Sequence, residues 1–498
     1  MNKLNRRRFL KTSLLASASA GALPAFGAEP ERKIPTSTTS RVVGANGDIR
    51  YAVVGFRQDG GRGQSHIQGM AELKGTRLVA LCDVDRSILD REVKKCQDAG
   101  KEIQGYTDIR KLLENKDIDV VTFATPNHWH ALGSIWAIQA GKDVYVEKPV
   151  SHNVWEGRQI VNAARKHNRI VQTGTQSRSS TGIAEAIAYL REGNLGKIIR
   201  ARGLCYKRRA SIGKVDGPQE VPASVDYDLW CGPAPKAPLM RKRLHYDWHW
   251  VWPTGNGDLG NQGIHEMDVA RWVLGEPELS SRVISIGGRL GYEDDGNTPN
   301  TLIVFHDYKA APLVYEVRGL PSGEGSDKMD KYRGADIGIV VDCEGGSVVI
   351  PSYSTATIMD KEGKEIKKFE GHTSHFANFV DAVRSRKHTD LKADILEGHL
   401  SSALCHTANI SYRLGKPHSP EEIKDAVKDN TDLSEMLGRM EEHLAANKVD
   451  LSKTPATLGA VLNMDPKTER FKDNAAANHM LTREYRKPFV VPETRISS

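Results

Sequence analysis

The chain has 498 residues, of which 39% are hydrophobic and 27% are charged. This length predicts two domains with a sizeable core in each, and the composition is ordinary for a soluble globular protein. The formal net charge is +7, but five of the positive charges lie in the first 11 residues, which contain no acidic residue. Without that segment the chain is close to neutral, which gives no electrostatic basis for nucleic-acid binding.

The first 28 residues predict a signal for export. Arg6-Arg7-Arg8 and Phe9-Leu10-Lys11 precede an apolar, alanine-rich run over residues 12–28, which is the layout of a signal peptide. The arginine pair resembles the twin-arginine signal, and this resemblance implies export of the folded protein to the periplasm. A basic tail or a short membrane anchor is the alternative, although the run is too short and too rich in Ala, Ser and Gly for a stable membrane span.

The six cysteines are scattered singly, without a CxxC pair or a Cys/His spacing that suits a metal. The periplasm permits disulfides, but nothing in the spacing requires one. We therefore expect no metal site, and buried or free thiols at Cys82, Cys96, Cys205, Cys231, Cys343 and Cys405.

Residues 29–47 are rich in Pro, Ser, Thr and Gly and predict a linker. Over residues 48–174, short apolar strands alternate with amphipathic helices, a pattern typical of a doubly wound parallel sheet in a Rossmann domain. The strands are expected at 51–54, 78–82, 120–124, 144–146 and 170–172, and the helices at 86–99, 109–115, 130–140 and 154–166.

Over residues 175–420, β-branched runs separated by turns predict a second domain, of α+β type with a largely antiparallel sheet. Residues 421–498 are a polar C-terminal extension with one helix over 433–447. The strands of the second domain are expected at 197–204, 282–287, 300–306, 313–317 and 338–341, and its helices at 184–191, 265–274, 376–385 and 398–414.

A glycine-rich loop separates the first strand from a helix. Such a loop allows a tight turn and the close approach of a pyrophosphate, which binds at the helix N-terminus. The loop is longer than the simple GxGxxG motif, and a turn without a ligand is the alternative. The residues expected to bind a dinucleotide here are Gly55, Phe56, Gly60, Gly61, Arg62 and Gly63.

Asp83 ends the second strand, twenty residues after Gly63, at the place where an acidic residue hydrogen-bonds the adenosine ribose. Since a carboxylate there would repel a 2′-phosphate, we expect NAD rather than NADP as the cofactor. The alternative role of Asp83 is to cap the helix that begins near Arg86.

Three further motifs carry a family resemblance: Ala124-Thr125-Pro126-Asn127-His128-Trp129-His130, Glu147-Lys148-Pro149 and Gly263-Ile264-His265-Glu266-Met267-Asp268. In their order and spacing the chain resembles the glucose-fructose oxidoreductase, inositol dehydrogenase and rhizopine-catabolism (Gfo/Idh/MocA) family over roughly residues 48–420. The resemblance implies a Rossmann domain and a C-terminal α/β domain whose open sheet often mediates homo-oligomers. It also implies hydride transfer at a sugar or cyclitol carbon in the cleft between the domains.

Oxidation of a secondary alcohol needs a base for the hydroxyl proton and a positive group near the developing alkoxide. Lys148 follows a parallel strand at the end where such sheets bind ligands, and the resemblance implies that it contacts the substrate hydroxyl and the cofactor ribose. A surface lysine is the alternative. The resemblance also implies cofactor contacts from Thr125, Pro126, Asn127, His130 and Glu147.

His265 is the candidate catalytic base, because the ordinary pKa of histidine is near neutrality. A structural cap at the start of a helix is the alternative. Four residues earlier the family commonly has Asp, whereas this chain has Asn261, which cannot accept a proton and is expected to bind a sugar hydroxyl. The usual Asp–His–Lys arrangement is therefore altered, and Asp268 is expected to orient rather than to react.

The segment 245–252 is rich in aromatic and histidine side chains, which suit the apolar face and the polar rim of a sugar. A core cluster is the alternative, and we expect His249 to contact the substrate. Tyr206 is a second expected contact, with a solvated strand edge as the alternative. His128 and Trp129 either line the site or simply pack.

Together these residues indicate a periplasmic oxidoreductase acting on a secondary hydroxyl of a sugar or glycoside. Because the periplasm offers no pool of free NAD, we expect the cofactor to stay bound and to be regenerated in place. One alternative is an NAD-retaining glycosidase, which oxidises C3, eliminates the glycosidic substituent, adds water and reduces the sugar again. The other is a sugar-binding module without catalysis, in which Lys148 and His265 would be dispensable.

Overall fold

The computed structural model describes residues 47–57 and 61–495, which belong to one compact unit. The predicted signal, all of the predicted linker except Gly47, and Gly60 lie outside the described residues.

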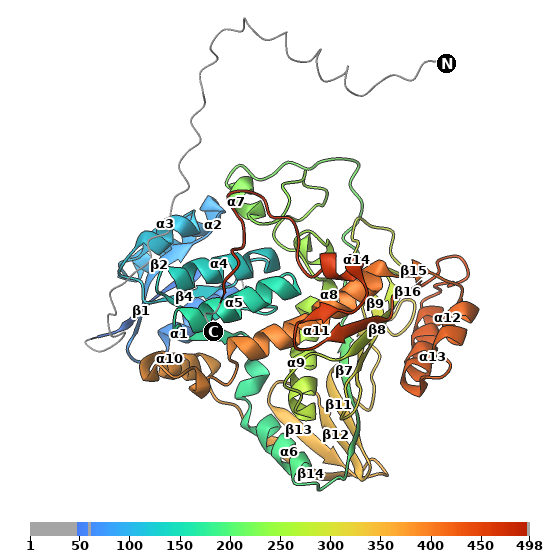
Figure 1. Cartoon of the computed structure of the whole chain (residues 1–498). Helices are drawn as coiled ribbons and strands as arrows, with labels where there is room; N and C mark the ends of the chain where they lie inside the picture. Colours follow the sequence, from blue (N-terminus) through green and yellow to red (C-terminus); the bar gives the residue numbers. More distant parts are fainter. Residues whose placement is uncertain (1–46, 58–60, 496–498) are drawn as a thin grey trace, which may run out of the picture. The chain divides into compact units, whose positions relative to one another are not determined.

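The first sheet has six parallel strands in the order β3-β2-β1-β4-β5-β6, the doubly wound arrangement of a Rossmann domain (Figure 1). Its central strands β1, β4 and β5 are fully buried, because helices cover both faces of such a sheet. The strands are β1 (Ile49–Val54), β2 (Thr76–Cys82), β3 (Gln104–Tyr106), β4 (Val120–Phe123), β5 (Asp143–Val146) and β6 (Val171–Thr173).

Helices alternate with these strands, as the sequence predicts. The side chains of Asp85, Asp108 and Asn153 cap three of them by accepting a backbone N–H of the first turn. The helices are α1 (Arg62–Ala71), α2 (Arg86–Asp98), α3 (Ile109–Glu114), α4 (Asn127–Gln139) and α5 (Val154–Lys166).

The second sheet has 12 strands and is mostly antiparallel, with β7 and β10 as a parallel pair. Its main path is β14-β13-β12-β11-β7-β10-β9-β8-β16-β15. The predicted fold class is therefore confirmed: a Rossmann domain precedes an α/β region with a largely antiparallel sheet. The strands are β7 (Ile198–Tyr206), β8 (Arg282–Gly288), β9 (Thr301–Asp307), β10 (Leu313–Arg318), β11 (Ile337–Cys343), β12 (Gly346–Ile350), β13 (Thr355–Met359), β14 (Glu365–Glu370), β15 (Lys416–Pro417), β16 (Thr457–Leu458), β17 (Leu462–Asp465) and β18 (Arg470–Phe471).

The remaining helices are α6 (Thr181–Arg191), α7 (Tyr227–Cys231), α8 (Gly257–Asn261), α9 (Gly263–Leu274), α10 (His375–Ser385), α11 (Ile395–Leu414), α12 (Pro420–Val427), α13 (Thr431–Ala446) and α14 (Ala475–His479). Five of them cover the two faces of the second sheet, namely α6, α9 and α11 on one face and α12 and α13 on the other. On β8, Val283 packs with α6, α9 and α11, whereas Ile284 packs with α12 and α13, because successive strand residues point to opposite faces. The homo-oligomer implied by the resemblance stays a prediction.

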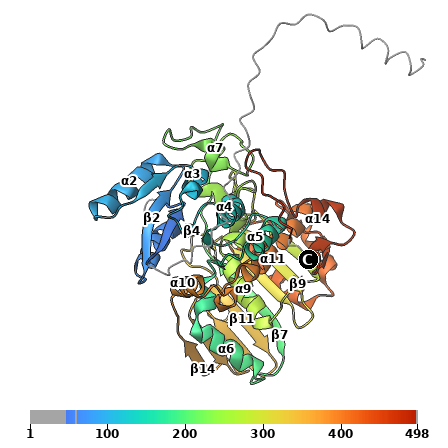
Figure 2. The ribbon, with the colours of Figure 1, turned by 60° about the vertical axis from the view of Figure 1, so that its left-hand side comes forward.

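Helix α11 lies against α5 of the first sheet and against β8 of the second (Figure 2). Two other late segments also pack on the first sheet. Phe379 of α10 shares a buried core with Tyr51 of β1, and the ring of Phe489 lies 5.6 Å from that of Trp129 in α4. Packing thus crosses the predicted boundary at residue 174, and the domain bounds stay predictions.

All six cysteines are buried and free in the described part of the chain, as the sequence predicts. Within residues 47–57 and 61–495, no group of His, Cys, Asp and Glu side chains is arranged to hold a metal ion. None of the helices in these ranges has the length and apolar character needed to cross a membrane.

Candidate active site

A cavity of about 410 Å³ lies at the C-terminal ends of the parallel strands, where doubly wound sheets bind ligands. We call it the cofactor cleft. The ends of β1, β2, β4 and β5 form one side of it. The other side consists of Leu229, Trp230, His245, Tyr246, Trp248, His249 and Asn261.

The glycine loop fits closely against its neighbours. Gly55 has a φ of +80°, which favours glycine, and a Cβ there would lie 2.8 Å from Thr125. A Cβ on Gly63 would lie 2.2 Å from the carbonyl oxygen of Gly55, so α1 begins directly against the loop. Among the described residues, no side chain caps α1, which leaves its first N–H groups to face a phosphate.

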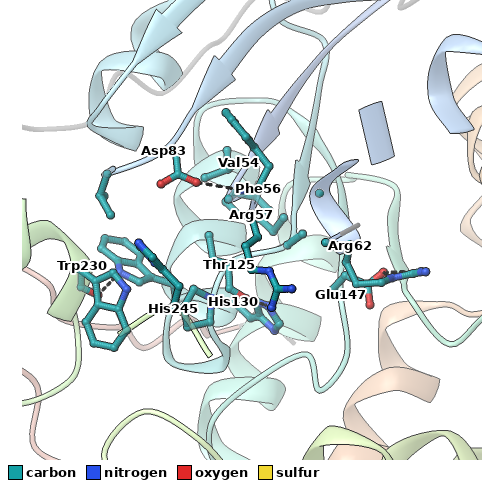
Figure 3. Close-up of a pocket in the computed structure, with 18 of the residues that line it drawn as sticks. Val54, Phe56, Arg57, Arg62, Asp83, Thr125, His130, Glu147, Trp230 and His245 are labelled. Carbon is teal, nitrogen blue, oxygen red and sulfur yellow. Dashed lines mark hydrogen bonds and ion pairs between the residues drawn. The ribbon is translucent and has the colours of Figure 1, made fainter. Parts of the chain in front are cut away.

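Asp83 faces the cofactor cleft from the end of β2. Its Oδ2 accepts the backbone N–H of Phe56 at 2.9 Å (Figure 3), and burial raises its pKa to about 6. The alternative role as a helix cap belongs to Asp85, whose Oδ1 accepts the N–H of Ser87 at 3.0 Å. The Oδ1 of Asp83 accepts the backbone N–H of Asp85 at 2.9 Å, so each carboxylate oxygen keeps one lone pair for a ligand hydroxyl.

Glu147 joins the end of β5 to the start of α1. Its Oε1 accepts hydrogen bonds from Nε and Nη2 of Arg62 at 3.1 and 2.9 Å and lies 3.2 Å from Nε2 of His66. Burial alone would raise the pKa of Glu147, but the charge of Arg62 and the contact with His66 hold it well below its usual value. Glu147 thereby fixes Arg62 at the edge of the cleft (Figure 3).

His130 links the two loops that carry the other predicted cofactor contacts. Its Nε2 lies 2.8 Å from the carbonyl oxygen of Thr125, and its Nδ1 lies 2.6 Å from that of Pro149. Asn127 is held by a 2.9 Å hydrogen bond from its Nδ2 to Oδ1 of Asn256. These side chains and Pro126 line the cleft, and their individual contacts with a cofactor stay predictions.

Lys148 enters the cleft directly after β5. Its Nζ donates a hydrogen bond to the backbone carbonyl of Asn261, so the structure brings together the motifs around these two residues. Burial lowers the pKa of Lys148, although Glu147 partly opposes this effect. The Lys148 amine thus lies in the cleft with a backbone carbonyl as its one hydrogen-bond partner among the described residues.

Two neutral histidines lie near Lys148. Burial and the charge of Lys148 hold the pKa of His265 well below its usual value, and its buried Nδ1 has no partner among the described residues. His249 lines the cleft itself. Its Nδ1 lies 2.6 Å from the carbonyl oxygen of Tyr246, and burial lowers its pKa to about 3. Because a carbonyl only accepts, Nδ1 carries the proton and Nε2 keeps a lone pair.

The substrate contact predicted for Tyr206 is wrong. This side chain is 1% exposed and its hydroxyl donates to Glu316 at 2.8 Å. Its neighbour Cys205 packs with α9, whereas Tyr206 packs on the opposite face of the sheet, because strand residues alternate. The residue is part of an ion-pair network away from the cleft.

Two other side chains near the predicted site have structural partners. Asp268 accepts hydrogen bonds from Arg178 at 2.8 Å and from Ser401 at 2.7 Å, so it orients Arg178 and not His265. His128 is fully buried, with Nε2 2.9 Å from the carbonyl oxygen of Trp230, which favours the packing alternative. Trp129 donates to the same carbonyl at 3.1 Å and also lines the cleft.

The sequence does not predict the part of the cleft formed by Leu229 and Trp230. These residues belong to the short helix α7, which carries no motif. The aromatic segment 245–252 is a signal for the neighbouring wall, but only the structure shows that His245, Tyr246 and Trp248 line it.

The fold and the cleft define a dinucleotide-binding protein with a Rossmann domain and an α/β domain that closes the site. The chain belongs to the Gfo/Idh/MocA oxidoreductase family. Residues 49–175 match the family's NAD-binding Rossmann fold and residues 196–439 match its C-terminal alpha/beta domain. The first domain is thus an NAD-binding Rossmann domain.

Curated relatives match over a shorter stretch. A Glycosyl hydrolase family 109 protein from Shewanella pealeana is 37% identical over 178 residues, which are 33% of this chain and 38% of the relative. An Alpha-N-acetylgalactosaminidase from Shewanella oneidensis is 32% identical over 176 residues, with the same coverage. The match therefore spans less than two-fifths of each relative's length.

Solved structures show the same fold over most of the chain. The WlbA dehydrogenase from Bordetella pertussis, in complex with NADH and UDP-GlcNAcA, has a TM-score of 0.54 and 19% identity, covering 74% of this chain and 97% of that one. An oxidoreductase from Thermotoga maritima has a TM-score of 0.54 and 16% identity, covering 73% and 96%. At these identities the likeness concerns the fold.

Proposed function

We propose that the protein is an NAD-dependent oxidoreductase that acts on a secondary hydroxyl of a sugar or glycoside and keeps its cofactor tightly bound. The observation that carries this proposal is a single cleft with Asp83 in its lining beside the glycine loop and with Lys148 and neutral His249 near Asn261. Such a cleft joins a dinucleotide site to a proton acceptor and a positive charge.

The residues present fit NAD. The tight Gly55–Gly63 contact and the uncapped start of α1 suit its pyrophosphate, and Asp83 suits the adenosine ribose. NAD, when bound, supplies the acceptor for the hydride. The chain would contribute a lone pair on His249 or His265 for the hydroxyl proton, and the Lys148 ammonium would stabilise the developing alkoxide.

Retention of NAD tests this proposal. We expect the purified protein to release NAD on denaturation in near-equal amount to the protein. The carboxylate form of Asp83 accepts from both ribose hydroxyls, whereas protonation turns one of its oxygens into a donor. The pKa of Asp83 is about 6 in the free cleft. NAD affinity should therefore be full above that pKa and fall about tenfold per pH unit below it, as titration of apo-protein at several pH values would show.

The variant Asp83→Asn should bind NAD weakly at every pH, because its amide cannot replace the carboxylate as a double acceptor. Asp98→Asn is the matched control, because it makes the same change at an exposed position outside the lining of the cleft, and it should bind NAD as the parent does. Release of no dinucleotide, together with weak binding of added NAD, would contradict the tightly bound cofactor.

The names of the Shewanella relatives favour a second function, that of a glycosidase. In the cycle expected for this alternative, NAD stays bound while the sugar is transiently oxidised and the glycosidic substituent is eliminated. That cycle removes a proton from the carbon next to the oxidised centre, whereas simple oxidation and reduction do not. For the oxidoreductase, we expect aryl glycosides and free sugars recovered from D2O to carry no deuterium at that carbon. Rapid exchange, measured by mass spectrometry, would instead favour the glycosidase.

We further propose that the protein is exported to the periplasm by the twin-arginine route. Support comes from Arg6-Arg7 followed by Phe9-Leu10-Lys11 and an apolar run, all of which lie outside the described residues. Replacing Arg6 and Arg7 together by Lys keeps the charge and should leave the protein in the cytoplasm on cell fractionation. Unchanged export of that variant would point to the general secretory route.

A further inference from the structure

A second pocket adjoins the cofactor cleft. Its described lining contains four arginines and no acidic residue, and Tyr246 and His245 belong to the walls of both cavities. We call it the arginine pocket and define it by Arg57, Arg208, Arg209 and Arg243.

Only part of this positive charge is neutralised. Arg209 forms a two-pronged ion pair with Asp258 at 2.8 and 2.7 Å. Arg243 forms a similar pair with Asp247 at 3.2 and 2.7 Å. Arg57 and Arg208 form no ion pair with a carboxylate of the described residues, so none of those carboxylates neutralises their guanidinium groups.

Aromatic rings hold these arginines in place. The guanidinium groups of Arg57 and Arg243 lie 5.7 and 5.5 Å from the centre of the Tyr246 ring, and that of Arg209 lies 5.2 Å from the centre of the Trp250 ring. A guanidinium stacked on a ring is less free to move. Arg57 keeps its N–H groups for an anion, whereas Arg209 and Arg243 keep those that their carboxylate partners do not take. The pocket is therefore preorganised for oxygens that carry negative charge.

The arginine pocket lies beside the reactive end of the cleft. His249 is bonded to the Tyr246 carbonyl at 2.6 Å, and its ring centre lies 5.0 Å from that of Tyr246. Lys148 and His249 line the cofactor cleft together with Arg57 and Tyr246, and the last two also line the arginine pocket. A molecule could thus contact Lys148 and the arginine pocket at once.

We propose that the arginine pocket binds an anionic group of the sugar substrate, such as a carboxylate, phosphate or sulfate, and so selects acidic glycosides. This inference rests on the proposed function, because it assumes that the substrate lies at Lys148. The adenosine 2′-phosphate of NADP is an alternative anionic ligand for this pocket. The Asp83 carboxylate faces the expected ribose position and would repel a 2′-phosphate there.

Calorimetric titration of inorganic sulfate into the full chain tests the proposal. The protein is first saturated with NAD, so that the pyrophosphate site is filled. We expect one saturable site, which Arg208→Gln weakens about tenfold or more and Arg208→Glu abolishes. Arg208 is the residue to replace, because it forms no ion pair with the other described residues. Arg57 is left unchanged, because it also lines the cofactor cleft.

Lys242 offers a matched control. It is exposed, lies next to Arg243 in sequence and is outside the lining of both cavities. Lys242→Gln and Lys242→Glu make the same changes in net charge and should alter sulfate affinity less than about twofold, because Lys242 does not line the pocket and its charge acts on a bound anion only through solvent that screens it. No saturable binding, or an equal loss in the Lys242 variants, would overturn the proposal.

A last experiment tests whether the pocket binds the anionic group of the substrate or the 2′-phosphate of NADP. NAD and NADP affinities are measured for the parent and for Arg208→Glu, and both should change little. If NADP affinity falls tenfold while NAD affinity stays, the pocket serves the cofactor and the substrate assignment is overturned. Failure of the proposed function would give a different result: the protein would not bind NAD but would still bind sulfate.

Discussion

Replacing Lys148 by Met should lower turnover by about 10²–10⁴-fold while NAD stays bound. The side chain follows β5 into the cleft and bonds to the Asn261 carbonyl, which fixes its charge where an alkoxide would form. Methionine keeps much of the volume but has neither the charge nor the N–H groups. Single-turnover hydride transfer, followed by nicotinamide absorbance with excess substrate, measures the effect without contributions from product release.

A histidine variant accompanies this experiment. His265→Ala should cause a comparable loss if His265 is the base, as the sequence predicts. The structure places His249 in the lining of the cleft, with Nε2 as the acceptor. Near-normal turnover of His265→Ala at all pH values would therefore transfer the role to His249. Activity of Lys148→Met equal to that of the parent would remove Lys148 from the chemistry altogether.

The sequence predicts most of the Rossmann sheet because its inner strands are continuous apolar runs. β1 and β4 are buried along their whole length, and such strands are visible without knowledge of their neighbours. The edge strand β3 is not predicted, because its three residues are polar or half-buried. The hairpin strands β12, β13 and β14 are likewise not predicted.

The site residues were predictable where their position depends on a short stretch of sequence. Asp83 follows its strand at a fixed distance from the glycine loop, and the structure brings both to the cleft. The substrate contact of Tyr206 was predicted wrongly, because the sequence does not show which face of β7 is on the side of the cleft. The role of Asp268 depends on Arg178, 90 residues away, and no local pattern reports such a partner.

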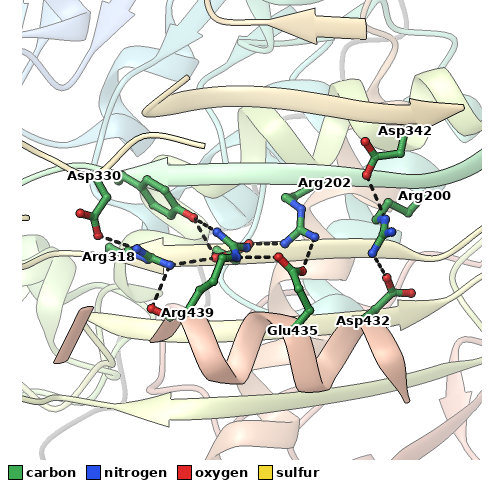
Figure 4. Close-up of polar contacts among 10 residues, drawn as sticks. Arg200, Arg202, Arg318, Asp330, Asp342, Asp432, Glu435 and Arg439 are labelled. Carbon is green, nitrogen blue, oxygen red and sulfur yellow. Dashed lines mark hydrogen bonds and ion pairs between the residues drawn. The ribbon is translucent and has the colours of Figure 1, made fainter. Parts of the chain in front are cut away.

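The network around Tyr206 lies between the second sheet and α13 (Figure 4). Its centre is Glu316 of β10, which is 1% exposed. One carboxylate oxygen accepts from Arg202 and Arg439, and the other accepts from Tyr206 at 2.8 Å. Three donors from β7 and α13, of which Arg202 and Tyr206 are buried, thus depend on one carboxylate.

Glu316→Gln should lower the free energy of unfolding by about 3–5 kcal/mol. The amide keeps the size of the side chain but removes the charge, and Arg202, which is fully buried, then loses one of its two anionic partners. The other partner, Glu435, lies 2.6 Å away on α13 and is more than a third exposed. Chemical denaturation, followed by circular dichroism, measures the loss.

The matched control is Asp98→Asn, which breaks the exposed pair with Lys94 on α2. An exposed pair is screened by water and salt, so the unfolding midpoint should not move measurably. Tyr206→Phe removes one donor to Glu316 and should destabilise the protein less than Glu316→Gln does, with the substrate KM unchanged. If Tyr206→Phe raised the KM without a change in stability, that result would indicate that Tyr206 contacts the substrate, in contradiction to the structure.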